Sequence, residues 1–240
     1  MRNSKDSINK EILDFIKDYT DMNICGVIMN CPYWMNKLKA GQIRIRGFLE
    51  GKGGACQIQN ELIKRLSSIR DKSAVTLTRI YLQKFAKRER IGIDCSGFVY
   101  RVLEKLVRLK YKGCQVSRLS AVFSGGVRKT NARRLAAPEY SIPIDRISDF
   151  QLGDMIRMRN GRHIAVILQV ENSRIIYAHS SNGTKIQGVH LGTIKIAKAD
   201  KSLQEQKWLE ETKKGENFGN RYFSEENGDG IFRLKIFCTL

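Results

Sequence analysis

The spacing of apolar residues changes along this chain, and the change limits the possible folds more than any other feature. In the first half, apolar side chains recur at helical spacing over residues 7–19, 57–68 and 76–87, and again directly after Cys95. In the second half they form short runs rich in β-branched residues, separated by turn signals such as Asn160-Gly161. Helices first and an antiparallel sheet second predict an α+β fold.

The predicted strands and connections can be placed approximately. Ser7 is expected to cap the opening helix. Strands are expected at residues 155–159, 163–170, 175–179, 193–197 and 232–237, with a basic helix at 202–214 between the last two. The polar, glycine-containing stretch 108–150 is expected to be a long connection with short helical pieces.

The chain has 240 residues, enough for one substantial domain with an extension. Residues 31–55 contain many glycines and are expected to form loops. We therefore predict an N-terminal helical and loop extension of unknown role over residues 1–75, and a principal domain over residues 76–240.

The net charge is strongly positive. Lys and Arg number 43 against 24 acidic residues, which gives a formal charge of +19. Such a balance favours association with anionic polymers, for example nucleic acid, anionic lipid or an acidic cell-wall polymer. A solvated basic surface without a specific partner is the alternative interpretation. The basic residues are dispersed, apart from a local group formed by Arg128, Lys129, Arg133 and Arg134.

The six cysteines show no C-x-x-C pair and no regular framework. This pattern indicates thiols in a reducing compartment, and we expect neither a metal site nor a cofactor. No signal peptide and no membrane-spanning apolar stretch is visible, so we expect a cytoplasmic protein or one exported by a route that the sequence does not show. A structural role is predicted for Cys25, Cys31, Cys56, Cys114 and Cys238.

Cys95 is the strongest candidate for a nucleophile. The apolar stripe that follows it places Cys95 in the first turn of a helix. The free backbone N–H groups and the dipole of a helix N-terminus favour a thiolate, so a lowered pKa of the thiol is expected there. The same N–H groups could donate to the oxyanion of a tetrahedral intermediate.

Two of the three histidines are placed to assist this thiol. His163 begins one predicted strand and His179 ends the next. If these strands pair as a hairpin with residue 164 opposite residue 180, the two rings lie at the same end of the sheet, as a general base and its orienting partner. His190 is expected in a glycine-flanked turn, with no catalytic role.

Four segments together resemble the NlpC/P60 cysteine peptidases in order and approximate spacing. The likeness covers about residues 78–197. The segments are DCSGFV at 94–99, LGDMI at 152–156, HIAVI at 163–167 and IYAHS at 176–180.

The resemblance implies a papain-like α+β core in which helices pack on an antiparallel sheet. It implies hydrolysis of an amide bond, commonly in peptidoglycan stem peptides, with Cys95 as nucleophile, His163 as base and His179 as third member. Asp94 and Ser96 would lie where family members contact the free amine of the substrate. Members often place an upstream tyrosine against the nucleophile, and Tyr33 and Tyr81 are the two candidates for that position.

Two other functions remain open. The absence of a visible export signal favours an amidase or transpeptidase that acts on protein or small-molecule amides inside the cell. The charge of +19 favours a catalytically idle module that binds polyanions. Gly51-Lys52-Gly53-Gly54 lacks the frame of a phosphate-binding P-loop and is interpreted as a plain loop.

Overall fold

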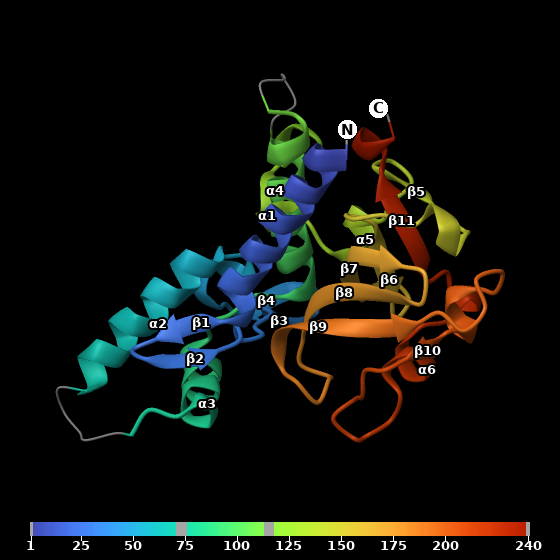
Figure 1. The fold of residues 1–240 in the computed structure, drawn as a ribbon. Helices are drawn as coiled ribbons and strands as arrows, with labels where there is room; N and C mark the ends of the chain where they lie inside the picture. Colours follow the sequence, from blue (N-terminus) through green and yellow to red (C-terminus); the bar gives the residue numbers. More distant parts are fainter. Residues whose placement is uncertain (1, 71–75, 113–117, 239–240) are drawn as a thin grey trace.

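The structure, a computed structural model, describes residues 2–70, 76–112 and 118–238 (Figure 1). It is a mixed helix and sheet fold, which confirms the α+β prediction. The helices are α1 (Arg2–Thr20), α2 (Ala55–Arg70), α3 (Arg79–Glu89), α4 (Cys95–Lys110), α5 (Ala132–Leu135) and α6 (Phe218–Tyr222). Short 3-10 turns cover Phe48–Gly51, Leu119–Ala121, Gly126–Lys129, Ile147–Asp149, Leu203–Glu205, Glu225–Asn227 and Lys235–Phe237.

Seven strands form one sheet in the order β10-β9-β8-β7-β6-β11-β5, and every neighbouring pair in it is antiparallel. These strands are β5 (Ser141–Pro143), β6 (Met155–Met158), β7 (His163–Glu171), β8 (Arg174–Ser181), β9 (Gly188–Lys195), β10 (Lys207–Trp208) and β11 (Gly230–Leu234). Two separate hairpins are formed by β1 (Met22–Ile24) with β2 (Val27–Met29), and by β3 (Lys37–Lys39) with β4 (Gln42–Ile45).

Helix α4 covers one face of the sheet, and α1 lies beside α4 (Figure 1). The alternation of strand side chains sets this contact, because Ile164 and Val166 of β7 join the hydrophobic core that contains the buried stripe of α4. The rings of Tyr19 and Phe98 meet edge to face, with centroids 5.3 Å apart, and fix α1 against α4. The first turn of α4 is thereby held against the start of β7.

A second core covers the opposite face of the sheet. Ala165 and Ile167 of β7 contribute to it, together with Trp208 and Phe218 from the C-terminal segment. Gly192 in β9 leaves room for a neighbouring ring here, because a Cβ atom at this position would lie 2.2 Å from Cζ of Tyr177. The sheet is thus buried on both faces.

The N-terminal segment shares the first core. Side chains of α1, β1 and α2, including Ile12, Met22 and Leu62, belong to the same buried cluster as those of α4. The Val189 N–H donates to the Cys31 carbonyl at 2.9 Å, which joins the start of β9 to this segment. The boundary at residue 75 stays a prediction.

Several local predictions differ from the structure. Helix α1 begins at Arg2, so Ser7 lies within it and is not its cap. The helix expected at 202–214 is wrong: a 3-10 turn at Leu203–Glu205, closed by a capping box between Ser202 and Glu205, is followed directly by β10. Burial of Trp208 in the second core favours the extended backbone there. The predicted structural cysteine at position 114 lies outside the described residues.

Strand β9 begins at Gly188, five residues before the predicted start at 193. Gly188 has a φ of +91°, and a Cβ atom at this position would lie 2.2 Å from the Cys31 carbonyl oxygen. The glycines around His190 therefore allow close packing against neighbouring segments. The turn that was predicted there is wrong. His190 lies within β9.

Across residues 2–70, 76–112 and 118–238, no helix combines the length and the apolar character that crossing a bilayer requires.

The buried ion pair between Arg233 and Asp154 yields a stability prediction. Asp154, from the LGDMI segment, is fully buried and accepts two hydrogen bonds from Arg233, at 2.7 and 2.8 Å. Arg233→Met should lower the free energy of unfolding in urea by about 3–5 kcal/mol, because it leaves a buried carboxyl without its partner. Arg174→Met, which breaks an exposed pair with Glu171, is the matched control and should change it little. Equal effects in the two variants would contradict this role of Asp154.

Candidate functional site

Cys95 is the first residue of α4, as predicted. Asp94 caps the helix, and its Oδ1 atom accepts a hydrogen bond from the Gly97 N–H at 2.6 Å. This cap fixes the direction in which the first turn leaves the preceding strand-like segment. The sulfur of Cys95 therefore lies at a defined helix N-terminus.

Lys52 contacts the two residues that flank Cys95. Its Nζ atom lies 2.8 Å from Asp94 Oδ1 and 2.6 Å from Ser96 Oγ, and the Ser96 hydroxyl donates to Asp94 at 3.0 Å. All three side chains are buried. Asp94 and Ser96, expected to contact the free amine of a substrate, are therefore already occupied by the ammonium group of Lys52.

Lys52 was missed in the sequence, where its glycine-rich surroundings indicated a plain loop. The feature that could have found it is Gly97. A Cβ atom there would lie 2.8 Å from the Gly51 carbonyl oxygen and 2.9 Å from Lys52 Cδ, so glycine is needed for the loop to approach the helix. The closeness of the two segments is a property of the tertiary structure.

The Cys95 thiol is less acidic than a helix N-terminus suggests. Burial and the neighbouring Asp94 carboxylate raise its pKa to about 12, against the opposing effects of the Lys52 charge and of the backbone N–H groups of Ile164 and Ser96. The expectation of a lowered pKa is thus wrong for the ligand-free protein, because burial outweighs the helix N-terminus. The interaction with the Ile164 N–H places the sulfur beside the start of β7.

His163 and His179 form the predicted pair. The Nε2 atom of His163 lies 2.7 Å from Nδ1 of His179. The paired residues Val166 and Ala178 have the register that sets residue 164 opposite residue 180, which confirms the predicted hairpin. Both rings are buried, and burial lowers the pKa of each, so both imidazoles are neutral at pH 7.

The row of hydrogen-bonded side chains that begins with His163 and His179 continues to His190, which was expected in a turn with no catalytic role, and to Glu210, which was not predicted. His190 pairs directly opposite His179 in the β8–β9 register, and their Nε2 atoms are 3.0 Å apart. Oε1 of Glu210 lies 2.9 Å from His179 Nε2 and 2.5 Å from His190 Nε2. Although burial opposes it, the two histidines lower the pKa of Glu210, which is therefore a carboxylate. The Tyr177 hydroxyl donates to the same carboxylate. No sequence pattern marks Glu210.

Cys95 and His163 reach the start of β7 from different directions. His163 is the first residue of the strand, and its ring packs near Phe218, with centroids 6.1 Å apart, on the face opposite the one that α4 covers. Among the described residues, no hydrogen bond joins the sulfur to this ring. The Nε2 atom of His163 is hydrogen-bonded to His179, so Nδ1 of His163 is the nitrogen that remains for an interaction with the thiol. Catalytic hydrogen bonds of this kind often form only in the substrate complex.

Tyr33 and Tyr81, the two candidates for an upstream tyrosine, differ in position. The pKa of the Tyr33 phenol is raised by burial and by Cys95 and Asp94, so Tyr33 lies near the nucleophile. Its segment forms a β-bridge to Ile93, just before the cap of α4. Tyr81 instead stacks on Phe85 within α3. The structure therefore selects Tyr33.

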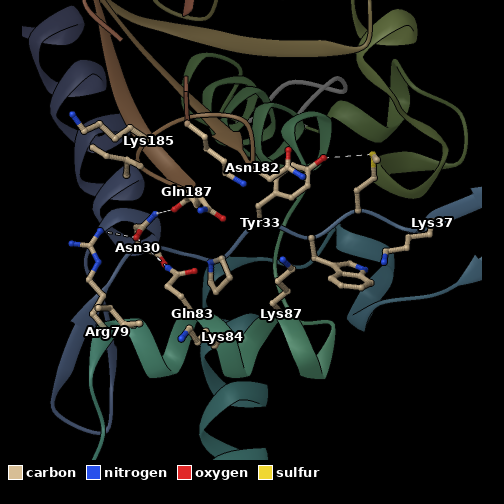
Figure 2. Close-up of a pocket in the computed structure, with 16 residues that line it drawn as sticks. Asn30, Tyr33, Lys37, Arg79, Gln83, Lys84, Lys87, Asn182, Lys185 and Gln187 are labelled. Atoms are coloured by element: carbon tan, nitrogen blue, oxygen red, sulfur yellow. Dashed lines mark hydrogen bonds between the residues drawn. The ribbon is translucent and has the colours of Figure 1, made fainter. Parts of the chain in front are cut away.

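A cavity of about 650 Å³ is lined in part by Tyr33, but not by Cys95 or His163. Cationic side chains from four stretches of the chain line it, and five of the six are labelled in Figure 2. They are Lys37, Arg79, Lys84, Lys87, Lys185 and Lys213. No acidic side chain lines the cavity among the described residues. Partial burial and the charge of Lys87 lower the pKa of Lys213, which indicates crowding of like charges. Such a cavity suits an anionic ligand.

The pKa of Cys95 leads to a test by alkylation. Because a pKa of about 12 leaves little thiolate at neutral pH, iodoacetamide should modify Cys95 more slowly than free cysteine at pH 7. The rate should still be rising at about pH 10, where free cysteine with a pKa of about 8.5 has levelled off. Lys52→Met removes a charge that lowers the pKa, so it should slow the reaction further, whereas Lys37→Met at an exposed position should not.

The rates are obtained by mass spectrometry of the Cys95 peptide after timed quenching. A plateau below about pH 8 would show instead that a thiolate is present in the resting protein.

Comparison of the chain with protein-family models, with curated proteins and with solved structures gives no match. The likeness to NlpC/P60 enzymes therefore depends on the four segments named above. The functional argument has to be made from the geometry of the site.

Proposed function

We propose that the protein is a cysteine hydrolase of the NlpC/P60 type, with a papain-like core, that cleaves an amide bond in peptidoglycan stem peptides or muropeptides. One observation carries the proposal. The buried series from His163 through His179 to Glu210 ends at the start of β7, where the Ile164 N–H interacts with the sulfur of Cys95.

The series supplies a general base with the correct tautomer. If Nε2–H of His163 donates to His179 Nδ1, then His179 Nε2–H donates to the Glu210 carboxylate. This arrangement leaves the lone pair of His163 Nδ1 free to take the proton of Cys95 when a substrate is bound. The Glu210 carboxylate then stabilises the imidazolium through His179.

The subsequent steps follow from the thiolate. The sulfur forms a bond to the carbonyl carbon of the substrate, and first-turn N–H groups of α4 stabilise the oxyanion. The His163 imidazolium returns its proton to the leaving amine as the C–N bond breaks, which leaves a thioester on Cys95. Water, deprotonated by the same imidazole, then releases the acid and the thiol.

The basic cavity supports an acidic substrate. Tyr33 lines the cavity and lies near Cys95, whereas Cys95 and His163 are not among the lining residues, so a substrate bound there would have to extend past Tyr33 to reach the sulfur. Stem peptides carry free carboxylates, which the surrounding lysines would bind. The same cavity suits other acidic amides.

The position of Lys52 favours a second candidate, an amidase or transpeptidase that acts on amides outside the cell wall. In the NlpC/P60 resemblance, Asp94 and Ser96 would bind the free amine of the substrate. Here the Lys52 ammonium group bonds to both side chains. We therefore expect the acyl part of the substrate to need no free amine, which widens the substrate class beyond trimmed stem peptides.

Purified muropeptides provide the test of catalysis. Cys95→Ala should abolish their cleavage, and His163→Ala should lower the rate by at least about 100-fold, because the general base is lost. Cys56→Ala, at an exposed cysteine that makes none of the contacts of the site, is the control and should cleave normally. Products are identified by mass spectrometry. Cleavage that persists unchanged in Cys95→Ala would contradict the mechanism, and absence of cleavage by the wild type would favour the second candidate or the polyanion-binding module.

The role of Lys52 is tested with a pair of substrates. One is a stem peptide with a free N-terminal amine, and the other is the same peptide with that amine acetylated. Because Lys52 already neutralises Asp94, the wild type should cleave the two with kcat/KM values within about tenfold of each other, a difference of about 1.4 kcal/mol. A strict requirement for the free amine would show that Lys52 is displaced by substrate.

A further inference from the structure

The proposed mechanism assigns no role to His190, which lies beside His179 and Glu210. His179, His190 and Glu210 each direct one ligand atom to a common point, and these atoms lie within 4.8 Å of one another. The three atoms are Nε2, Nε2 and Oε1, with separations of 3.0, 2.9 and 2.5 Å. Among the described residues, this is the group whose composition suits a metal ion.

The two contacts of His190 require either an additional proton or a metal ion at its Nε2 atom. The Nδ1 atom of His190 lies 3.0 Å from the Gly188 carbonyl oxygen, which can only accept, so Nδ1 carries a proton. In a neutral ring, Nε2 then presents a lone pair to Oε1 of Glu210, only 2.5 Å away. Two acceptors at this distance need a proton or a metal ion between them. Two protons, one on His179 Nε2 and one on His190 Nε2, would each be donated to the Glu210 carboxylate, whereas a single metal ion would replace both protons and bind all three atoms.

The surroundings of the three ligand atoms are those of a metal site. Each ligand is held by a second contact: Nδ1 of His179 by His163, Nδ1 of His190 by the Gly188 carbonyl, and the carboxylate of Glu210 by the Tyr177 hydroxyl. These contacts fix which atom of each side chain faces the centre. No metal site was predicted, because the ligands come from two paired strands and a later loop and show no metal-binding spacing in the sequence.

An adjoining cavity supplies access and an open position. It has a volume of about 340 Å³ and is lined by His190 and Glu210, together with Leu191, Leu209 and Glu211. A fourth ligand such as water can approach from this side, while His179 closes the inner side. Two imidazoles, one carboxylate and an open position form a set that suits zinc. Zinc–ligand distances of about 2.0–2.2 Å require the three atoms to move apart by several tenths of an ångström.

We propose that His179, His190 and Glu210 bind a divalent transition-metal ion, with zinc as the matching probe. Binding requires the lone pair of His179 Nε2, so the proton of His179 moves to Nδ1 and is donated to Nε2 of His163. The proton of His163 then resides on Nδ1, which can no longer accept the proton of Cys95. The metal site and the thiol chemistry exclude each other, so zinc is an inhibitor; this second part rests on the proposed function.

Zinc binding is measured directly, in protein carrying Cys25→Ser, Cys56→Ser, Cys114→Ser and Cys238→Ser so that these thiols do not compete. Competition with a chromophoric chelator should give one zinc ion per chain. His190→Asn and Glu210→Gln should each weaken the affinity by at least about tenfold. Glu211→Gln, at the neighbouring residue that lines the same cavity, is the matched control and should bind zinc as the parent does.

A thermal melt gives a second readout and reports whether each variant folds. Zinc should raise the Tm of the parent and of Glu211→Gln but not that of Glu210→Gln. Tyr177→Phe keeps all three ligands and should bind with intermediate affinity. Parent protein that binds zinc no more tightly than Glu210→Gln, or equal losses in Glu210→Gln and Glu211→Gln, would overturn the site.

Inhibition is scored separately. Zinc should suppress muropeptide cleavage by the parent and should suppress it less in His190→Asn. If the parent binds zinc as described but cleaves no muropeptide, the proposed function fails and the metal site stands. If the parent cleaves substrate and saturating zinc leaves the rate unchanged, the mutual exclusion is wrong.

Discussion

The antiparallel register of β7, β8 and β9 is the constraint on which the candidate site depends. It sets His179 beside His163 on one side and directly opposite His190 on the other. Because neighbouring strands in a sheet lie about 4.8 Å apart, side chains on one face at matching positions meet. A slip of one residue in either pairing would turn a ring to the opposite face and break the series.

Two buried groups of charged side chains flank the candidate site. On the helix side, the Lys52 ammonium group neutralises Asp94 beside Cys95. On the other side, Glu210 is shared between two histidines. Burial raises the pKa of the Cys95 thiol and lowers that of the His163 imidazole, so at neutral pH the thiol is protonated and the imidazole is neutral. The proposed chemistry at Cys95 would therefore require a proton transfer to His163 on substrate binding, and the tautomers of His163 and His179 would decide whether His163 can accept that proton.

The position of Lys52 also shows how one site can differ from the family it resembles. In the resemblance, a carboxylate and a hydroxyl flanking the nucleophile would receive an amine from the substrate. Here the chain supplies that amine itself. The cavity lined by Tyr33 is basic, and under the proposed function it would favour a substrate with carboxylates. Under the proposed function, substrate preference would depend on Lys52 and Tyr33 as well as on the segments that carry the resemblance.

The sequence alone determined the helix that begins at Cys95, the hairpin that pairs His163 with His179, and the α+β order, because these features follow from local hydrophobic periodicity and short turns. It did not reveal the roles of Lys52, His190 or Glu210. Lys52 lies 42 residues before Asp94, and Glu210 lies 31 residues after His179. Contacts over such separations leave no periodic signal in the sequence. The glycines around His190 are typical of a turn in the sequence, and only the structure shows that they make room for Cys31 and Tyr177. Only the tertiary structure brings these groups together, because burial and register over the whole sheet decide which distant side chains meet.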